Sequence, residues 1–145
     1  MNATQKLATF YVGGFYCGIH TKDVVELTKD LDVTPVPLSP NPVLGLLNQR
    51  GHIVTAINMR LRLSEPDRTL TTESTGIFYK HATGLFAFVV DRVGEIVELS
   101  PQEFESPPTN LTGPSLDFLM GVYKLPDSLL LVLDPQKLIT GIPAV

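Results

Sequence analysis

The chain has 145 residues, of which 43% are hydrophobic and 18% are charged, so it fits one domain or two very small units that share a core, and wholesale disorder is excluded. Its net charge of −4 disfavours nucleic acid and anionic membrane surfaces as partners, because both attract basic faces. The first residues lack the apolar core of a signal peptide, and the longest apolar runs, 85–90 and 129–133, are far too short for a membrane span, so we expect a cytoplasmic protein without direct membrane insertion.

The N-terminal residues predict a β-hairpin. Two largely apolar segments, 7–12 and 15–20, flank Gly13-Gly14, a pair that is typical of tight hairpin turns. Period-two alternation places Cys17 on the apolar face of the second strand. We therefore interpret this single cysteine as a core residue and not as a reactive thiol, and it excludes an intramolecular disulfide.

Residues 21–28 predict one helical turn followed by a short strand, with Glu26 at a solvated position. Residues 34–42 contain four prolines and predict a stiff, extended connector. The alternative, a proline-rich signalling ligand, is disfavoured because the segment lies inside the domain. Ser39 or Asn41 is expected to cap a short helix that holds Val43, Leu44 and Leu47, with Pro42 near its first turn.

The stretch from Gly45 to Arg60 predicts a strand, a two-residue turn and a second strand. Arg50-Gly51 lies at the centre, and glycine permits the positive φ that a tight hairpin needs. An arginine held on a rigid turn beside exposed Leu46 and Leu47 is a candidate interaction anchor.

The remaining chain predicts further short strands. They are expected over 75–80, 85–91, 95–99, 118–124 and 128–133, with turns over 81–84 and 91–94 and a terminal helix over 135–140 capped by Asp134. The run 85–90 is apolar at consecutive positions, which predicts a strand covered on both faces. Nine or ten short strands indicate an all-β barrel or sandwich, and two small barrels that share an apolar seam suit the length best.

Motifs for catalysis are missing from the sequence. There is no phosphate-binding glycine loop and no Gly-x-Ser-x-Gly elbow. His20, His52 and His81 are isolated from one another and from a second cysteine, so neither a metal site nor a cofactor is predicted. A partner-binding surface is the leading hypothesis. The alternative is a small acidic β-barrel that binds a small molecule or single-stranded nucleic acid, although a basic groove with stacking aromatics is lacking.

Several motifs occur in a specific order along nearly the whole chain. They are Val24-Val25-Glu26-Leu27, Thr34-Pro35-Val36-Pro37, Gly45-x-x-Asn48-x-Arg50-Gly51, Ile53 to Arg60, Val89 to Ile96, Gly121-Val122 and Leu130 to Asp134. In this order and spacing they resemble the CheW-like family, the coupling (adaptor) proteins of bacterial chemotaxis. The chain departs from the family pattern at Gln49, usually apolar, at Thr55, commonly proline, and at Asn58, usually aspartate. The loss of that carboxylate removes a charged partner for a nearby arginine.

This resemblance implies two five-stranded SH3-like β-barrels packed through a shared hydrophobic seam. The approximate subdomains are residues 20–84 for the first barrel and residues 1–19 plus 85–145 for the second. The implied function is a non-enzymatic adaptor that couples the helical cytoplasmic tip of a chemoreceptor, a methyl-accepting chemotaxis protein, to the regulatory domain of a CheA-type histidine kinase. A flagellar, type IV pilus or other signalling system would use such a protein.

The expected partner-binding residues follow from this resemblance. Arg50 is the leading hot-spot candidate, with Glu26 and Gly51 next. Gly45, from the motif that contains Arg50, and Gly94, from the motif Val89 to Ile96, are further candidates. An amphipathic helical hairpin would lay its apolar ridge into a groove between the barrels. The candidates to line that groove, about half of which we expect to be core, are Val24, Val25, Val43, Leu46, Leu47, Val93 and Ile96.

Overall fold

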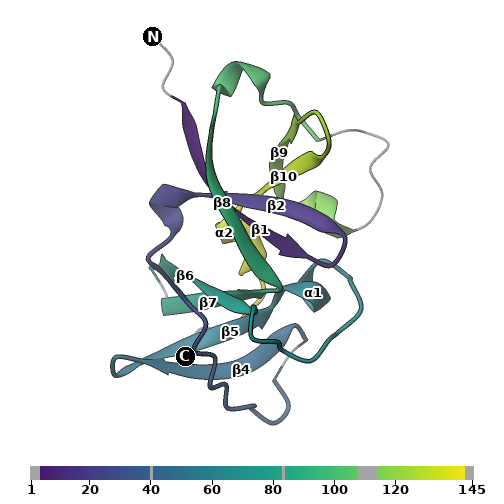
Figure 1. The fold of residues 1–145 in the computed structure, drawn as a ribbon. Helices are drawn as coiled ribbons and strands as arrows, with labels where there is room; N and C mark the ends of the chain where they lie inside the picture. The colour runs from purple at the N-terminus through teal and green to yellow at the C-terminus, as the bar shows by residue number, and fades with distance from the viewer. Residues whose placement is uncertain (1–3, 40, 83, 108–113, 143–145) are drawn as a thin grey trace.

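The computed structural model describes residues 4–39, 41–82, 84–107 and 114–142, and these fold into two five-stranded sheets. The first sheet has the order β8-β1-β2-β10-β9 and the second β3-β6-β7-β5-β4. The strands are β1 (Gln5–Val12), β2 (Phe15–His20), β3 (Glu26–Thr28), β4 (Val43–Gln49), β5 (His52–Asn58), β6 (Thr75–His81), β7 (Gly84–Val90), β8 (Arg92–Leu99), β9 (Leu119–Lys124) and β10 (Leu129–Leu133). Figure 1 shows the first sheet above the second. The prediction of an all-β protein with two five-stranded units is confirmed.

The first sheet combines both ends of the described chain. The predicted hairpin forms, with Val12 opposite Phe15 across the Gly13-Gly14 turn. On its other side β2 pairs in parallel with β10, where Leu131 lies opposite Cys17. β8 pairs with the free side of β1, and β9 with the free side of β10.

The second sheet contains the predicted Arg50-Gly51 hairpin, but its first strand begins where we expected a helix. Val43 already pairs with Ile57, and Leu46 lies between Thr55 on β5 and Thr34 of the proline-rich connector. The backbone N–H and C=O of Leu46 both bond to Thr34, each at 2.8 Å. The prediction of a helix was wrong because these groups are satisfied between strands, which overrides the local capping pattern.

The expected division between residues 84 and 85 was also wrong. β7 pairs with β6 along its whole length and in parallel with β5, so it belongs to the second sheet. The chain crosses to the first sheet at Asp91, and β8 begins directly at Arg92, where we expected a turn. β7 lies between two apolar clusters: Phe86 faces the core between the sheets, and Ala87 faces a smaller core.

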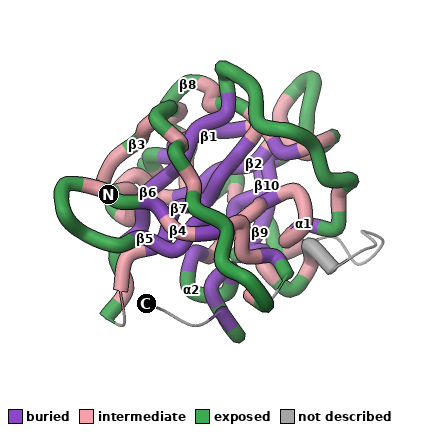
Figure 2. Tube along the Cα trace, turned by 90° about the horizontal axis from the view of Figure 1, so that it is seen from below, coloured by how far each residue is buried: buried purple, intermediate pink, exposed green. Residues whose placement is uncertain are grey.

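The main core lies between the sheets, where Figure 2 shows the buried trace of the central strands surrounded by exposed loops. Phe10 and Cys17 from the first sheet meet Ile57 and Phe88 from the second, and all four are at most 1% exposed. Burial raises the pKa of the Cys17 thiol far above its ordinary range, with the charge of Glu65 adding to the effect. The interpretation of Cys17 as a core residue is therefore confirmed.

Short helical turns close the loops. The 3-10 turn η1 (Thr21–Asp23) precedes β3 as predicted. Helix α1 (Met59–Arg62) follows β5, and helix α2 (Pro135–Leu138) begins at the predicted cap, because an Asp134 carboxylate oxygen accepts from the backbone N–H of Gln136 at 3.0 Å. Two further 3-10 turns, η2 (Pro101–Glu103) and η3 (Pro114–Phe118), lie between β8 and β9. Across the described ranges, no helix has the length and apolar character that a membrane crossing requires.

Candidate partner-binding surfaces

Eight of the twelve predicted site residues fall on two surfaces that meet at β3. We call one the turn surface, and its lining comes from the start of β3, the β4–β5 turn and the β6–β7 hairpin. Its residues are Val25, Glu26, Gln49, Arg50, Gly51, His52, Ile53, Phe78, Lys80, His81, Ala82, Gly84 and Leu85. We call the other the inter-sheet groove, which is lined by Ala8, Thr9, Thr21, Val24, Leu27, Ile77, Val93, Gly94 and Ile96.

The β4–β5 turn presents Arg50 in a fixed conformation. Arg50 and Gly51 have φ angles of 51° and 83°, so both occupy the left-handed region that a two-residue hairpin of this type needs. The side-chain oxygen of Asn48 accepts from the N–H of Gly51 at 3.0 Å, which braces the turn from within. A side chain at position 51 would meet open space but would strain the backbone, so glycine is required there for conformation alone.

Glu26 is the polar centre of the turn surface. One carboxylate oxygen pairs with Arg50 Nη1 at 3.3 Å, and the other accepts from Gln49 Nε2 at 2.5 Å. The Arg50 side chain stays 78% exposed, whereas that of Glu26 is 27% exposed. A pair this exposed contributes little to stability. The exposed guanidinium of Arg50 can therefore also form charge-assisted hydrogen bonds with a partner.

The turn surface also carries exposed apolar side chains. Val25 is 59% and Ile53 46% exposed, and both line this surface together with the Glu26–Arg50 pair. Sequence reasoning missed Ile53 and the contact of Gln49 with Glu26. The Gln49–Glu26 contact could have been anticipated from the departure from the family pattern at position 49, since a polar side chain beside a turn needs a partner.

The inter-sheet groove runs between two free sheet edges. β8 is an edge of the first sheet and β3 an edge of the second, so the groove is bounded by both. Ile96 from β8 is 64% exposed, and Leu27 from β3 is 45% exposed. Val24 and Val93 are half-buried and pack against the main core while they line the groove. Sequence reasoning missed Leu27, although it belongs to the same four-residue motif as Val24.

Four of the candidates lie outside both surfaces and support β4 instead. Leu47 is buried in the smaller core, and Val43 packs half-buried against the main core. Leu46 pairs with Thr34, and a Cβ at Gly45 would collide with the backbone oxygen of Thr34. These residues fix the strand that carries the turn and do not line either surface.

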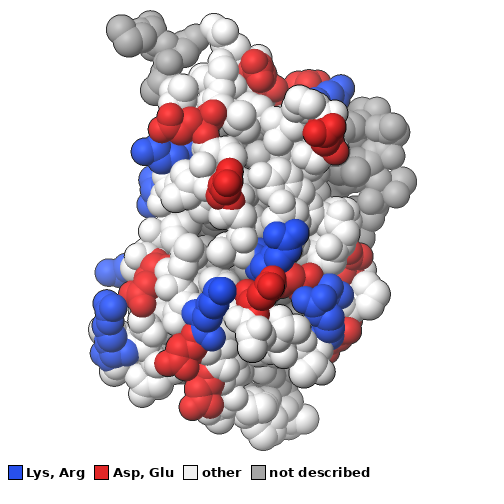
Figure 3. All heavy atoms as spheres, viewed as in Figure 1, with Lys and Arg blue, Asp and Glu red and all other residues white. Residues whose placement is uncertain are grey.

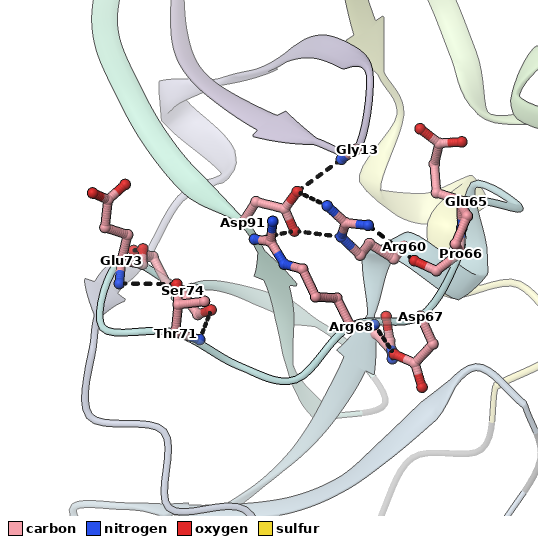
Figure 4. A network of polar contacts seen from close by, with 12 residues as sticks. Gly13, Arg60, Glu65, Pro66, Asp67, Arg68, Thr71, Glu73, Ser74 and Asp91 are labelled. Carbon is pink, nitrogen blue, oxygen red and sulfur yellow. Dashed lines mark hydrogen bonds and ion pairs between the residues drawn. The ribbon is translucent and has the colours of Figure 1, made fainter.

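A polar network around Asp91 joins the two sheets near the end of the β1–β2 hairpin (Figure 4). The Asp91 carboxylate accepts from Arg60 Nε at 2.9 Å, from Arg60 Nη2 at 2.8 Å and from the backbone N–H of Gly13 at 2.8 Å. Arg68 Nη2 lies 3.5 Å away, and Glu65 accepts from the N–H of Gly14 at 2.7 Å. The network therefore ties the turn of the first sheet to α1 and to the strand crossing at Asp91.

The charge of Asp91 is favoured by these contacts. Burial alone would raise its pKa, but the hydrogen bonds from Arg60 and Gly13 and the charges of Arg60 and Arg68 offset that effect, so the pKa of Asp91 is lowered. Asn58 does not pair with Arg60. Its side chain caps α1 by accepting from Leu61 N–H at 3.2 Å and donates to Asp67 at 2.9 Å.

The surface charge agrees with protein partners more than with a polyanion. Over the upper part of the face in Figure 3, acidic side chains predominate, and lower down acidic and basic side chains are interspersed. In the described part of the chain, no three His, Cys, Asp or Glu side chains gather in a metal-binding arrangement. Both surfaces offer apolar contact, and the turn surface adds charged hydrogen-bonding groups from Glu26, Arg50 and Lys80.

Comparisons with known proteins give one consistent result. The family model described as CheW-like domain matches residues 6–142. "Chemotaxis protein CheW" of Treponema pallidum is 31% identical over 94% of this chain and 82% of its own length, and its namesake of Helicobacter pylori is 24% identical over 90% and 78%. The crystal structure of the scaffolding protein TtCheW from Thermoanaerobacter tengcongensis superposes with a TM-score of 0.85 at 25% identity and covers 96% of this chain and 93% of that one.

Proposed function

The chain belongs to the CheW-like family, and we propose that it is a non-enzymatic scaffold of a chemotaxis-type system that couples a chemoreceptor to a CheA-type histidine kinase. It would act in the cytoplasm, at membrane receptors that it reaches through its partners. The observation that carries the proposal is the presence of two distinct surfaces, adjoining at β3, that both expose apolar side chains, because a coupling protein must hold two partners at once.

The inter-sheet groove suits the receptor. It is an apolar slot bounded by two strand edges, with Ile96 and Leu27 exposed on opposite sides. The apolar ridge of an amphipathic helical hairpin would fill such a slot, with its polar face left in water. Exposed apolar side chains on a soluble surface are the usual mark of this kind of contact.

The turn surface supplies the anchor for further contacts. Arg50 is exposed and oriented by Glu26, which in turn is held by Gln49. Arginine on a rigid element is enriched among residues that dominate binding energy. We therefore expect the affinity for at least one of the two partners to depend on Arg50.

The proposal is tested by measuring binding of the purified protein to a cytoplasmic receptor fragment and to a kinase regulatory domain. We expect both to bind, and Arg50→Ala to weaken at least one complex by about 2 kcal/mol, or roughly 30-fold, with an unchanged circular dichroism spectrum. Lys22→Ala, an exposed basic residue on neither surface, serves as the control. Failure of the unmodified protein to bind either partner would refute the coupling function, and an unfolded Arg50→Ala variant would refute the anchor role.

A further inference from the structure

β8 contains a bulge that decides which side chains face the inter-sheet groove. Phe10 lies opposite Val93 and Ala8 lies opposite Ile96, so two steps along β1 correspond to three steps along β8. In a regular strand, residues three apart point to opposite faces of the sheet. The extra residue restores Val93 and Ile96 to the same face, and both of them line the groove.

The bulge is held by one buried hydroxyl. Thr9 lies between Ala8 and Phe10 on β1, is 1% exposed, and donates from Oγ1 to the carbonyl oxygen of Glu95 at 2.5 Å. A bulge interrupts the ladder of backbone hydrogen bonds at the extra residue, which leaves backbone groups that need other partners. The Thr9 hydroxyl satisfies one of them from the neighbouring strand.

Because Gly94 has no side chain, it leaves room for the Thr9 hydroxyl. A Cβ at position 94 would lie 2.6 Å from Thr9 Oγ1 and 3.4 Å from a ring carbon of Tyr11. Any side chain there would displace either the hydroxyl or the strand. Thr9 and Gly94 thus fit each other across the β1–β8 pair.

We propose that Thr9 is a positioning residue for partner binding: its hydroxyl locks the Gly94-Glu95 bulge and so keeps Ile96 in the inter-sheet groove beside Val93. The affinity part of this inference rests on the proposed function. The position of Ile96 does not, because it is a property of the free protein.

Thr9→Val removes the donor and keeps the shape of the side chain, whereas Thr9→Ser keeps the donor. Thr75→Val is the matched control, because Thr75 is also buried, donates to a backbone carbonyl (Glu73, 3.0 Å), and lines neither surface. We expect Thr9→Val to lower the affinity for the receptor fragment about tenfold, with Thr9→Ser and Thr75→Val within about threefold of the unmodified protein. Binding of the kinase regulatory domain should remain within about twofold in all three.

A second measurement separates the role of Thr9 in the bulge from the proposed function in receptor binding. The methyl resonances of Ile96 in the free protein should shift in Thr9→Val and stay in place in Thr9→Ser and Thr75→Val. Unchanged Ile96 resonances, or equal losses of affinity in Thr9→Ser and Thr9→Val, would overturn the role of Thr9. A shifted Ile96 signal in a protein that binds no receptor fragment would support the bulge lock and refute the proposed function.

Gly94→Ala covers the case in which Thr9→Val fails to fold. The added methyl group would push the hydroxyl away from the bulge, so we expect the same shift of Ile96 and the same selective loss of receptor affinity. If Gly94→Ala folds and its Ile96 methyl resonances stay where they are in the unmodified protein, the proposal is overturned.

Discussion

The ion pair between Arg60 and Asp91 should stabilise this fold more than any other single polar contact described above. Both side chains are about one-sixth exposed, at 16% and 15%, and they are joined by two hydrogen bonds of 2.9 and 2.8 Å. Asp91→Asn keeps the shape of the side chain but removes its charge, and its amide group would present donors to the donors of Arg60 or Gly13. Arg60 would then be left largely buried without a full counter-charge.

Breaking one side of a largely buried pair costs about 3 kcal/mol, at the lower end of the range for such pairs because some solvent reaches both groups. For a domain of this size, 1 kcal/mol corresponds to about 2–4 °C in Tm, so we expect Asp91→Asn to lower Tm by about 6–12 °C. Thermal unfolding followed by circular dichroism at pH 7, together with urea unfolding at 25 °C, would measure the effect.

Glu105→Gln is the matched control. Glu105 pairs with Lys124 at 3.4 Å, but their side chains are 48% and 66% exposed. Exposed pairs of this kind contribute less than about 1 kcal/mol, so Tm should change by no more than about 4 °C. If the two substitutions lower Tm equally, the conclusion that the Arg60–Asp91 pair stabilises the fold more than an exposed ion pair does is wrong.

Further predictions concern pH, packing and thiol reactivity. Because the pKa of Asp91 is lowered in the folded state, its contribution is present above the ordinary carboxyl pKa of about 4 and is lost as the pH falls through the folded-state value; the urea midpoints of the unmodified protein and Asp91→Asn should therefore converge on acidification below about pH 4. Thr55→Val should raise the free energy of unfolding by about 1 kcal/mol, since the buried Thr55 hydroxyl has no hydrogen-bond partner among the residues that the structure describes, and an unchanged or lower urea midpoint would contradict this. Gly45→Ala should destabilise the protein by more than about 1 kcal/mol, because a φ of 153° is strained for alanine and the neighbouring Thr34 carbonyl leaves no room for a methyl group; a Tm equal to that of the unmodified protein would count against that reasoning. Cys17 should react with a thiol reagent only at the rate of global unfolding, so rapid labelling under native conditions would disprove its burial.

The sequence predicted local structure where turn chemistry and alternation agree. Gly13-Gly14 and Arg50-Gly51 each connect strands with the right register, and Asp134 caps the helix that follows it. The helix expected near Val43 failed because a capping pattern is a local signal, whereas pairing with the connector and with β5 is decided by residues far along the chain. Such long-range pairing leaves no periodic mark at the segment itself.

The site was predictable only in part for a similar reason. Arg50 and Glu26 come together as a turn and a neighbouring edge strand, and both lie in recognised motifs. That Val25 and Val24 belong to different surfaces depends on how β3 is placed between the sheets, which pattern analysis does not reveal. The role of Thr9 depends on a bulge in the β1–β8 register, which no alternation of apolar residues indicates.

The strand order of the first sheet also governs how the protein can be made. β1 and β2 leave the ribosome before the other strands of the two sheets, yet the open side of β2 is completed only by β10, more than a hundred residues later. Until then this apolar edge is exposed, which is the condition under which nascent chains pair wrongly or bind chaperones. The second sheet, whose strands all lie between β3 and β7, is complete in sequence before β8 emerges. Synthesis therefore favours an order in which the second sheet forms early and serves as the template on which the two ends of the chain are joined.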